Sequence, residues 1–439
     1  MLARLRRTLA LTSMVLAVAA GTLAPAYADN VVTPGDFTGY GFDQCLTPTQ
    51  QKMTTWMETS PFSAVGIYIS GDSRACRDQP NLTPDWVTTQ LAAGWRLLPI
   101  TLGPQASCTT RDRYLKQVRI NPDPTSAYAK AKTQGAAEAD KTVRAATALG
   151  IAAGSTLWYD IEAFNIAPTD CRESALTFLS SWTDQLHKLG FVSGIYSSAA
   201  SGIKILDDAR ALRPGRYTMP DQLWIADWNG KADVYSTYIR SDGWMPHKRV
   251  HQYRGGHNET YGGVTINIDS NWLDVGLGSR VGKEPAHCGS VSYNLSQWPT
   301  LRPGVSGSAG VKALQCMLKN RGLFAGTVTG TYDTATIKAA RTYQARQKLS
   351  LSDTWTTRHW LAILTQGAKP VAKIGTADTA VRRLQRALTA AGAGPVSVTG
   401  VVDKATVEAI KAYQNATRLP AYGVAGTTTW QGLASGRTG

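Results

Sequence analysis

Signatures of several enzyme classes are missing from this chain of 439 residues. None of its six cysteines belongs to a Cys-x-x-Cys pair, which argues against a zinc ribbon or a dithiol redox site. The sequence has no Gly-x-Ser-x-Gly motif to present a nucleophilic serine and no His-Glu-x-x-His motif to hold zinc. Its one long apolar run, Leu9 to Ala20, is too short to span a bilayer as a stable helix. We therefore expect no membrane span and neither of these two kinds of hydrolase.

The apolar run lies between two features of a secretory signal peptide. Three arginines precede it, and a site with small residues at Ala26 and Ala28 follows it. We therefore expect residues 1–28 to be removed on export and the mature protein to act outside the cell. The Arg6-Arg7 pair leaves both the general secretory route and the twin-arginine route open.

The six cysteines fit an oxidising compartment, in which disulfides persist. Four of them follow predicted strands, which places them on one rim of the fold and leaves three pairings open. These four are Cys45, Cys76, Cys108 and Cys171. The other two, Cys288 and Cys316, lie outside that rim and bracket the start of a repeated segment. We predict that they pair.

Positive charge is concentrated near the end of the chain. The whole sequence has a net charge of +15, from 46 basic and 31 acidic residues. Residues 29–288 hold 25 basic and 26 acidic residues, whereas residues 289–439 hold 18 basic and 5 acidic ones, a net of +13. A near-neutral body with a basic C-terminal part predicts docking on a polyanion. In a secreted protein, we expect a cell-wall polymer rather than nucleic acid.

The basic part repeats itself with an offset of 70 residues. A linker rich in Gly, Pro and Ser precedes it at 281–304. Each copy predicts a helix, a glycine-containing turn, a second helix and a short helix with a tryptophan, and Asp333 is expected to cap the second helix of the first copy. The matching positions are Gln315, Gly330, Asp333, Thr336, Gln344 and Trp360 in the first copy and Gln385, Gly400, Asp403, Thr406, Gln414 and Trp430 in the second.

These paired motifs resemble the helical peptidoglycan-binding repeat that is attached to many wall hydrolases. The resemblance implies two small all-α modules of three helices each, at 305–366 and 372–436, which hold an enzyme on the cell wall. It identifies no individual binding residue in this sequence. Helical spacers that bind no ligand are the alternative.

The segment at 36–280 alternates strand and helix signals. Thr47 and Thr83, each followed by proline, are predicted to cap helices. Eight strands with helices between them predict an α/β fold, a (β/α)8 barrel of the TIM type. The link between the last two strands is too short for a helix, so we expect an irregular barrel. The predicted strands are 39–43, 64–70, 96–101, 156–161, 191–196, 222–227, 249–253 and 264–269.

Carboxyl groups end three of the predicted strands. In such barrels the active site lies at the carboxyl ends of the strands, so we expect these groups to meet at one rim. They are Asp43, Asp160, Glu162 and Asp269. Like charges packed together raise the pKa of at least one member, and a protonated carboxyl beside an ionised one is what glycoside hydrolysis needs. The alternative interpretation of Asp160 and Glu162 is a solvated strand end.

Aromatic and amide side chains are expected on the same rim. Tyr196 ends the fifth strand, Trp224 and Trp228 flank the end of the sixth, and Gln252 and Tyr253 end the seventh. Aromatic faces beside an amide suit a sugar ring, which presents apolar C–H faces and hydroxyl edges. We predict Tyr196, Trp224, Trp228 and Gln252 as substrate-binding residues, with a core position as the alternative for Trp224.

Five motifs follow the strands in order: Gly41-Phe42-Asp43, Tyr159-Asp160-Ile161-Glu162, Gly194-Ile195-Tyr196-Ser197, Ala226-Asp227-Trp228-Asn229-Gly230 and Ile268-Asp269-Ser270-Asn271. The first three and the last resemble motifs of the family 25 lysozymes. A closer match is a secreted glycoside-hydrolase-like family catalogued as domain of unknown function 1906, with which the chain shares the motif Ala226-Asp227-Trp228-Asn229-Gly230. The resemblance implies that Glu162 is the general acid and that Asp160, Asp43 and Asp269 support it. Cysteine-bearing loops at 72–81 and 104–113 depart from the lysozymes and are expected to reshape the cleft.

The sequence therefore predicts a secreted, wall-associated glycoside hydrolase that acts on peptidoglycan or a related anionic wall glycan and uses no cofactor or metal. The main alternative is a barrel that binds the glycan without turning it over. A zinc site built from His247, His251 and His257 would lack the usual ligand spacing, and the carboxylates could instead hold calcium. No nucleic-acid partner is expected, and the oligomeric state stays open.

Overall fold

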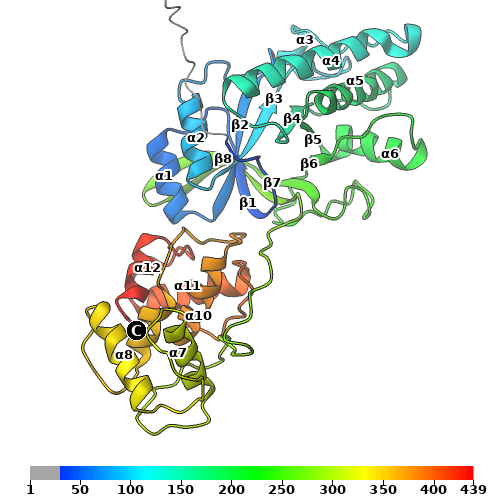
Figure 1. The fold of residues 1–439 in the computed structure, drawn as a ribbon. Coiled ribbons are helices and arrows are strands. Elements are labelled where there is room, and N and C mark those ends of the chain that lie inside the picture. Colours follow the sequence, from blue (N-terminus) through cyan, green and yellow to red (C-terminus); the bar gives the residue numbers. More distant parts are fainter. Residues whose placement is uncertain (1–29, 439) are drawn as a thin grey trace, which may run out of the picture.

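The structure is a computed structural model that describes residues 30–438. The predicted signal peptide at 1–28 lies outside the described residues. Figure 1 shows a barrel with surrounding helices and, below it, a smaller helical body. The strands are β1 (Phe37–Asp43), β2 (Phe62–Ser70), β3 (Arg96–Thr101), β4 (Thr156–Asp160), β5 (Val192–Ser198), β6 (Gln222–Ala226), β7 (Lys248–Tyr261) and β8 (Val264–Val275).

The eight strands form a closed barrel in sequence order. Strands β1 to β7 are parallel to one another, whereas β8 is antiparallel to both β7 and β1. This confirms the predicted α/β barrel and its irregular last connection. There, β7 turns directly into β8 through Gly262 and Gly263, whose positive φ angles favour glycine.

Helices cover the outside of the barrel, with α1 and α2 on one side and α4, α5 and α6 on the other (Figure 1). Helix α2 begins at Pro84 behind the Thr83 cap, as predicted. Helix α1 is capped by Thr49 and not by Thr47, because the Gln79 and Asn81 side chains bind the N–H and the carbonyl of Thr47. The helices are α1 (Gln50–Thr59), α2 (Pro84–Ala92), α3 (Asp112–Leu115), α4 (Thr125–Ala148), α5 (Thr169–Lys188), the π-helix η1 (Ala199–Ile203) and α6 (Lys204–Leu212).

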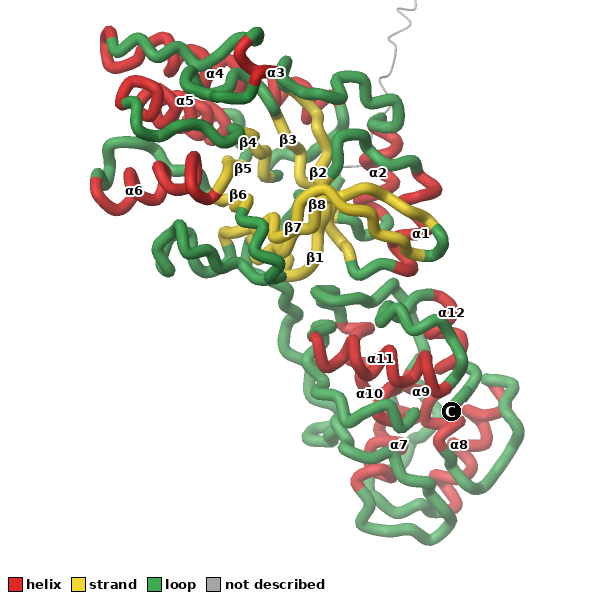
Figure 2. Tube along the Cα trace, turned by 180° about the vertical axis from the view of Figure 1, so that it is seen from behind, coloured by secondary structure: helices red, strands yellow, loops and turns green. Residues whose placement is uncertain are grey.

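Strands β7 and β8 are longer than predicted. Their far halves form a hairpin that extends past Tyr253 and pairs back to Asp269 (Figure 2). The hairpin packs on α1, where Trp56 Nε1 donates a hydrogen bond to the Val264 carbonyl at 3.0 Å and the ring of Tyr261 meets that of Trp56 edge-on. Because the hairpin is rich in polar residues, apolar alternation did not reveal it.

Large aromatic side chains fill the interior of the barrel. Trp158 and Trp224 pack edge to face with ring centroids 5.5 Å apart, and Tyr196 packs on Trp224 at 5.4 Å. Trp158 occupies the space beside Gly194, where an added Cβ would lie 2.3 Å from the indole. The interior is therefore a packed core rather than a pore, as is usual for this architecture.

Six helices form the second body, which confirms the two small all-α modules. Asp333 and Asp403 cap the second helix of their repeats, each accepting a backbone N–H at 2.8 Å. Gln315 accepts the Gly330 N–H, as its counterpart in the second repeat accepts that of Gly400, so the repeated residues shape the glycine turn. The helices are α7 (Ala309–Lys319), α8 (Thr334–Arg346), α9 (Thr357–Leu364), α10 (Thr379–Ala390), α11 (Lys404–Ala416) and α12 (Thr427–Ala434).

The two repeats form one unit. A single hydrophobic core runs through both of them, and it contains Trp360 of the first repeat and Trp430 of the second. The predicted Cys288–Cys316 disulfide is present and ties the linker to α7. Neither repeat therefore has a complete core of its own.

The second repeat is docked on the barrel beside α1, an arrangement that the sequence did not predict (Figures 1 and 2). The buried Lys373 donates a hydrogen bond to the Met57 carbonyl at 2.9 Å, and its ammonium group lies 4.8 Å from the centre of the Trp95 ring. Glu58 accepts a hydrogen bond from the Thr427 N–H at 3.1 Å. Among residues 30–438, every helix is too short or too polar to span a bilayer.

Candidate active site

Four carboxyl groups gather at the rim where the parallel strands end. Asp43 ends β1, Asp160 ends β4, and Glu162 lies two residues beyond β4. Asp269 pairs directly with Asp43 across β1 and β8. The prediction that the eighth strand ends at Asp269 is wrong, because β8 continues to Val275. This strand runs in the opposite direction to β1, so its first half reaches the same rim.

Asp43 is buried within this carboxyl cluster. Its Oδ2 accepts hydrogen bonds from Asn271 Nδ2 at 2.7 Å and from Gln252 Nε2 at 3.0 Å. Burial, followed by the negative charge of Asp269, raises the pKa of Asp43 to about 8. Gly66 on β2 provides the necessary space, since an added Cβ would lie 2.6 Å from the Cβ of Asp43.

Asp160 is buried next to it. The Tyr68 hydroxyl donates to Asp160 Oδ2 at 3.3 Å, and Oδ1 has no hydrogen-bond partner within the described residues. Burial, followed by the charges of Glu162 and Asp43, raises the pKa of Asp160 well above its usual value. Burial also raises the pKa of Asp269. Part of the cluster therefore holds protons at neutral pH, as expected for carboxyl groups crowded away from water.

Glu162 reaches the opening of the cleft, with 20% of its side chain exposed. Arg111 pairs with its Oε2 at 3.1 Å, and the Tyr114 hydroxyl donates to its Oε1 at 3.4 Å. Gln105 fixes the turn before it, donating to the Asp160 carbonyl at 2.9 Å and accepting the Glu162 N–H at 2.8 Å. In this arrangement the Arg111 guanidinium stabilises a negative charge on Glu162.

Gln252 connects the carboxyl cluster with two aromatic side chains. Its Nε2 lies 3.5 Å from Asp269 Oδ2. Its Oε1 accepts hydrogen bonds from the Tyr196 hydroxyl at 3.0 Å and from Trp228 Nε1 at 2.9 Å. Trp228 is 67% exposed, so its ring is open to a ligand. The structure thus brings Tyr196, Trp228 and Gln252 together with the carboxyl groups.

Two aromatic residues that were predicted at the rim lie elsewhere. Trp224 is only 1% exposed and donates from Nε1 to Asn271 Oδ1 at 2.7 Å, so it positions Asn271 and cannot face a substrate. This corrects its assignment as a substrate-binding residue and favours the core alternative. Tyr253 points to the opposite face of β7 from its neighbour Gln252, because strand side chains alternate, and it faces the second repeat.

The cleft above the cluster has a volume of about 180 Å³. This is small beside the roughly 300–1,000 Å³ of many ligand pockets. Arg74 and Cys76 line it from the segment after β2, and Arg113 and Tyr114 from the segment after β3. The cysteine-bearing loops therefore do shape the cleft, as expected, and they surround an acidic cluster with arginines.

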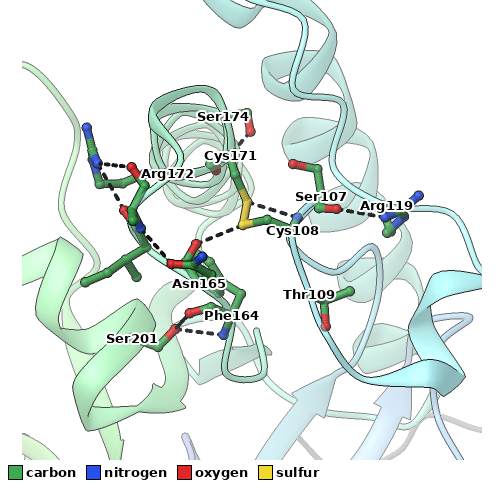
Figure 3. Close-up of a disulfide and its surroundings, with 12 residues drawn as sticks. Ser107, Cys108, Thr109, Arg119, Phe164, Asn165, Cys171, Arg172, Ser174 and Ser201 are labelled. Carbon is green, nitrogen blue, oxygen red and sulfur yellow. Dashed lines mark hydrogen bonds between the residues drawn. A yellow bond between two sulfur atoms is a disulfide. The ribbon is translucent and has the colours of Figure 1, made fainter.

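Disulfide bonds anchor both loops. The pairs are Cys45–Cys76 and Cys108–Cys171, a choice that the sequence left open. Figure 3 shows that the second bond joins the loop after β3 to the first turn of α5, and the Cys108 N–H also points at the sulfur of Cys171 at 3.1 Å. The same loop carries Arg111, the partner of Glu162.

Replacing Cys108 and Cys171 by serine is expected to destabilise the protein. The bond closes a loop of 63 positions. The chain-entropy model assigns about 4 kcal/mol to such a loop. Denaturant titration under non-reducing conditions should show an earlier unfolding midpoint than the wild type. An unchanged midpoint contradicts this prediction.

Several residues of the site were not predicted. Asn271 lies two positions from Asp269 on the same strand face, so strand parity could have identified it. Gln105 and Arg111 come from a rim loop, where no periodicity predicts the path of the chain. Tyr68 could have been identified only weakly, from its position near the carboxyl end of β2.

The histidines near β7 have structural partners. His247 Nδ1 lies 2.8 Å from Asp274 Oδ1, and His251 Nε2 lies 2.8 Å from the Asp227 carbonyl. His257 bonds within the hairpin. Within the part of the chain that the structure describes, no three His, Cys, Asp or Glu side chains are placed to hold a metal ion.

The buried Asp43 predicts a pH-dependent stability. Because its folded-state pKa of about 8 exceeds the unfolded value of about 3.9, its contribution to stability is present below about pH 4 and is lost as the pH rises through 8. Asn cannot ionise, so Asp43→Asn should raise the Tm relative to wild type more at pH 8.5 than at pH 5. Thermal unfolding of both proteins across this range tests it, and a Tm difference that does not change with pH contradicts it.

Family models match both bodies. The model of the Rv2525c-like, glycoside hydrolase-like domain matches residues 54–273, and that of a peptidoglycan-binding domain matches residues 307–353 and 377–433. Both resemblances expected from the sequence are thereby confirmed. The chain joins a glycoside hydrolase-like barrel to peptidoglycan-binding repeats. No curated protein matches this chain.

Three solved structures match part of this chain. They are an uncharacterized protein of B. stearothermophilus (18% identity, 54% of this chain, 95% of that chain, TM-score 0.34), the Tat-secreted protein Rv2525c of Mycobacterium tuberculosis in complex with HEPES (13%, 55%, 97%, 0.31) and the spore cortex lytic enzyme SleM of Clostridium perfringens (14%, 54%, 67%, 0.35). These similarities are too low to carry an argument. The family model, in contrast, covers half of the chain, and the protein therefore belongs to the Rv2525c-like, glycoside hydrolase-like domain family.

Proposed function

We propose that this protein is secreted, associates with the cell wall and hydrolyses a glycosidic bond in peptidoglycan or a related anionic wall glycan. The observation that carries the proposal is the group of four carboxyls at the rim of the barrel, in which burial raises the pKa of three aspartates. Glycoside hydrolysis needs one carboxyl that gives a proton and another that carries charge. The matched peptidoglycan-binding domain supports the choice of substrate.

Glu162 is proposed as the general acid because it reaches the opening of the cleft, whereas Asp43 and Asp160 are buried below it. To accept a proton, Glu162 must leave Arg111. The Arg111 side chain is 51% exposed and lies on a rim loop, so an entering substrate with its own negative charge can take over this guanidinium. Asp269, which lines the cleft, is proposed to carry charge near the developing oxocarbenium ion. Asp43, which pairs with it across β1 and β8 and is held by two amide donors, is proposed to support it.

Asp160 is proposed as a positioning residue. Its backbone carbonyl holds Gln105, which in turn holds the Glu162 N–H, and its own carboxyl faces Tyr68 instead of the opening. A neutral Asp160 beneath Glu162 would limit the repulsion between the two groups. Trp228 and Tyr196, both bonded to Gln252, are proposed to contact the sugar.

A barrel that binds the glycan without hydrolysing it is the second candidate. Two features favour it. The cleft is small, and the Arg111–Glu162 ion pair occupies the carboxyl group that would have to give the proton. The two candidates differ in turnover. Purified wall glycan incubated with the full chain should release reducing sugar if the barrel is an enzyme. Binding without release of reducing sugar from any wall glycan tested would favour the silent barrel.

A further inference from the structure

We propose that the groove between the barrel and the second repeat is a separate binding site for a sugar that carries an acidic peptide. It goes beyond the proposed hydrolysis, because it lies away from the carboxyl cluster and requires no turnover. The groove has a volume of about 630 Å³, within the roughly 300–1,000 Å³ typical of ligand sites.

The barrel contributes aromatic side chains to this groove. Tyr40 of β1 and Tyr253 and Tyr261 of the β7–β8 hairpin line it and are half-buried. Tyr40 is held in place by Trp272, with ring centroids 4.8 Å apart and nearly perpendicular planes. Phe62 packs against Tyr261 at 6.1 Å. Rings that are fixed by neighbours and still partly open are suited to the C–H face of a sugar.

The second repeat contributes positive charge. Lys404 and Lys411 of α11 line the opposite wall, together with Glu408 and the exposed Tyr422. Glu408 pairs with Lys411 at 2.9 Å, whereas Lys404 forms no ion pair within the described residues. Lys411 and Tyr40 line the same groove from the two bodies, so this lysine faces the barrel across it. Its charge opposes the burial-driven rise in the pKa of Tyr40.

The groove has a net positive charge. Arg254 of the hairpin pairs with Glu259 at 3.4 Å, as Lys411 does with Glu408, so these two pairs cancel. Lys404 remains, because it forms no ion pair among the described residues. Lys373 also lines the groove, but its ammonium group is buried against α1 and bonded to the Met57 carbonyl. The ligand that matches tyrosine rings and an unpaired ammonium group is a sugar ring with an attached carboxylate-bearing peptide, and a muramoyl peptide has this chemistry.

The first repeat carries different side chains at the matching positions. At the 70-residue offset, Thr334 and Arg341 occupy the positions of Lys404 and Lys411. Both are exposed, and Arg341 instead pairs with Asp353 at 3.1 Å. The groove therefore depends on docking of the second repeat against the barrel, and the first repeat supplies a matched control position.

The test measures binding of a purified muramoyl tripeptide, a single sugar without a glycosidic bond, to the full chain by isothermal titration calorimetry. We expect Lys404→Ala combined with Lys411→Ala to weaken binding roughly tenfold, and Tyr422→Ala to weaken it by a similar factor. Amidation of the peptide carboxylates should mimic the loss of the lysines. Arg341→Ala should bind as wild type does, and circular dichroism confirms that each variant is folded.

Glu162→Gln separates this proposal from the proposed hydrolysis. It should leave the affinity for the muramoyl tripeptide unchanged, whether or not the barrel is an enzyme. Affinity that survives the lysine and tyrosine substitutions overturns the groove proposal, as does absence of measurable binding to the wild type. Affinity that falls equally with Arg341→Ala overturns it too, since a general charge effect would then explain the binding.

Discussion

Replacing Glu162 by glutamine is expected to lower release of reducing sugar from wall glycan by about 10²–10⁴-fold, the usual contribution of a positioned general acid. Glutamine keeps the shape of the side chain, so the Gln105 contact to the backbone of residue 162 should persist. It cannot give a proton to the departing sugar oxygen. Affinity for wall fragments should change little, because the amide still fills the site.

The control for this substitution is Asp184→Asn on α5, a carboxyl-to-amide change outside the carboxyl cluster, which should retain the wild-type rate. The substitution Asp160→Asn tests whether Asp160 is a positioning residue and not the general acid. Asn keeps the backbone carbonyl that binds Gln105 but cannot ionise next to Glu162, so Asp160→Asn should shift the pH dependence of the rate as well as slow it. Wild-type activity in Glu162→Gln would eliminate Glu162 as the acid and direct attention to Asp269, which also lines the cleft.

A chain that ends at Gly282 is expected to lose about 10²-fold or more in apparent affinity for insoluble cell wall. Residues 289–439 carry a net charge of +13, and the matched peptidoglycan-binding domain lies there. Linked sites gain affinity through effective concentration, by factors of about 10²–10⁴. The cut must precede both repeats because they share one hydrophobic core, and removing one alone would expose the core of the other.

Co-sedimentation with purified walls at increasing salt measures this loss. The full chain should bind less as salt rises, because screening weakens exposed charge pairs, and the truncated chain should show little salt dependence. Full-length Glu162→Gln is the control that keeps the repeats while altering the cleft, and it should sediment as wild type does. Equal sedimentation of full-length and truncated protein would refute a docking role for the repeats.

Much of the site was predictable because strand ends in a parallel barrel meet at one rim. Asp43 and Asp160 follow directly from that rule. Asp269 was correctly placed at the rim, but the reason was wrong. It was expected to end the eighth strand, whereas β8 is antiparallel to β1 and continues to Val275. Trp224 shows the limit of the rule. It lies two positions before Ala226, the end of β6, and points into the packed interior, and a tryptophan suits either place.

Some features follow from patterns in the sequence alone. Periodicity and repetition predicted the barrel, the two helical repeats and the Asp333 cap, and position along the chain predicted the Cys288–Cys316 pair. Tertiary structure decided what depends on contacts between distant segments. Gln105 and Arg111 reach Glu162 only because a disulfide-anchored loop folds over the rim. The second repeat meets the barrel through contacts such as those of Lys373 with the Met57 carbonyl and of Thr427 with Glu58. Such contacts join residues tens to hundreds of positions apart, and no local pattern in the chain encodes which of many possible partners a loop or a buried lysine will find.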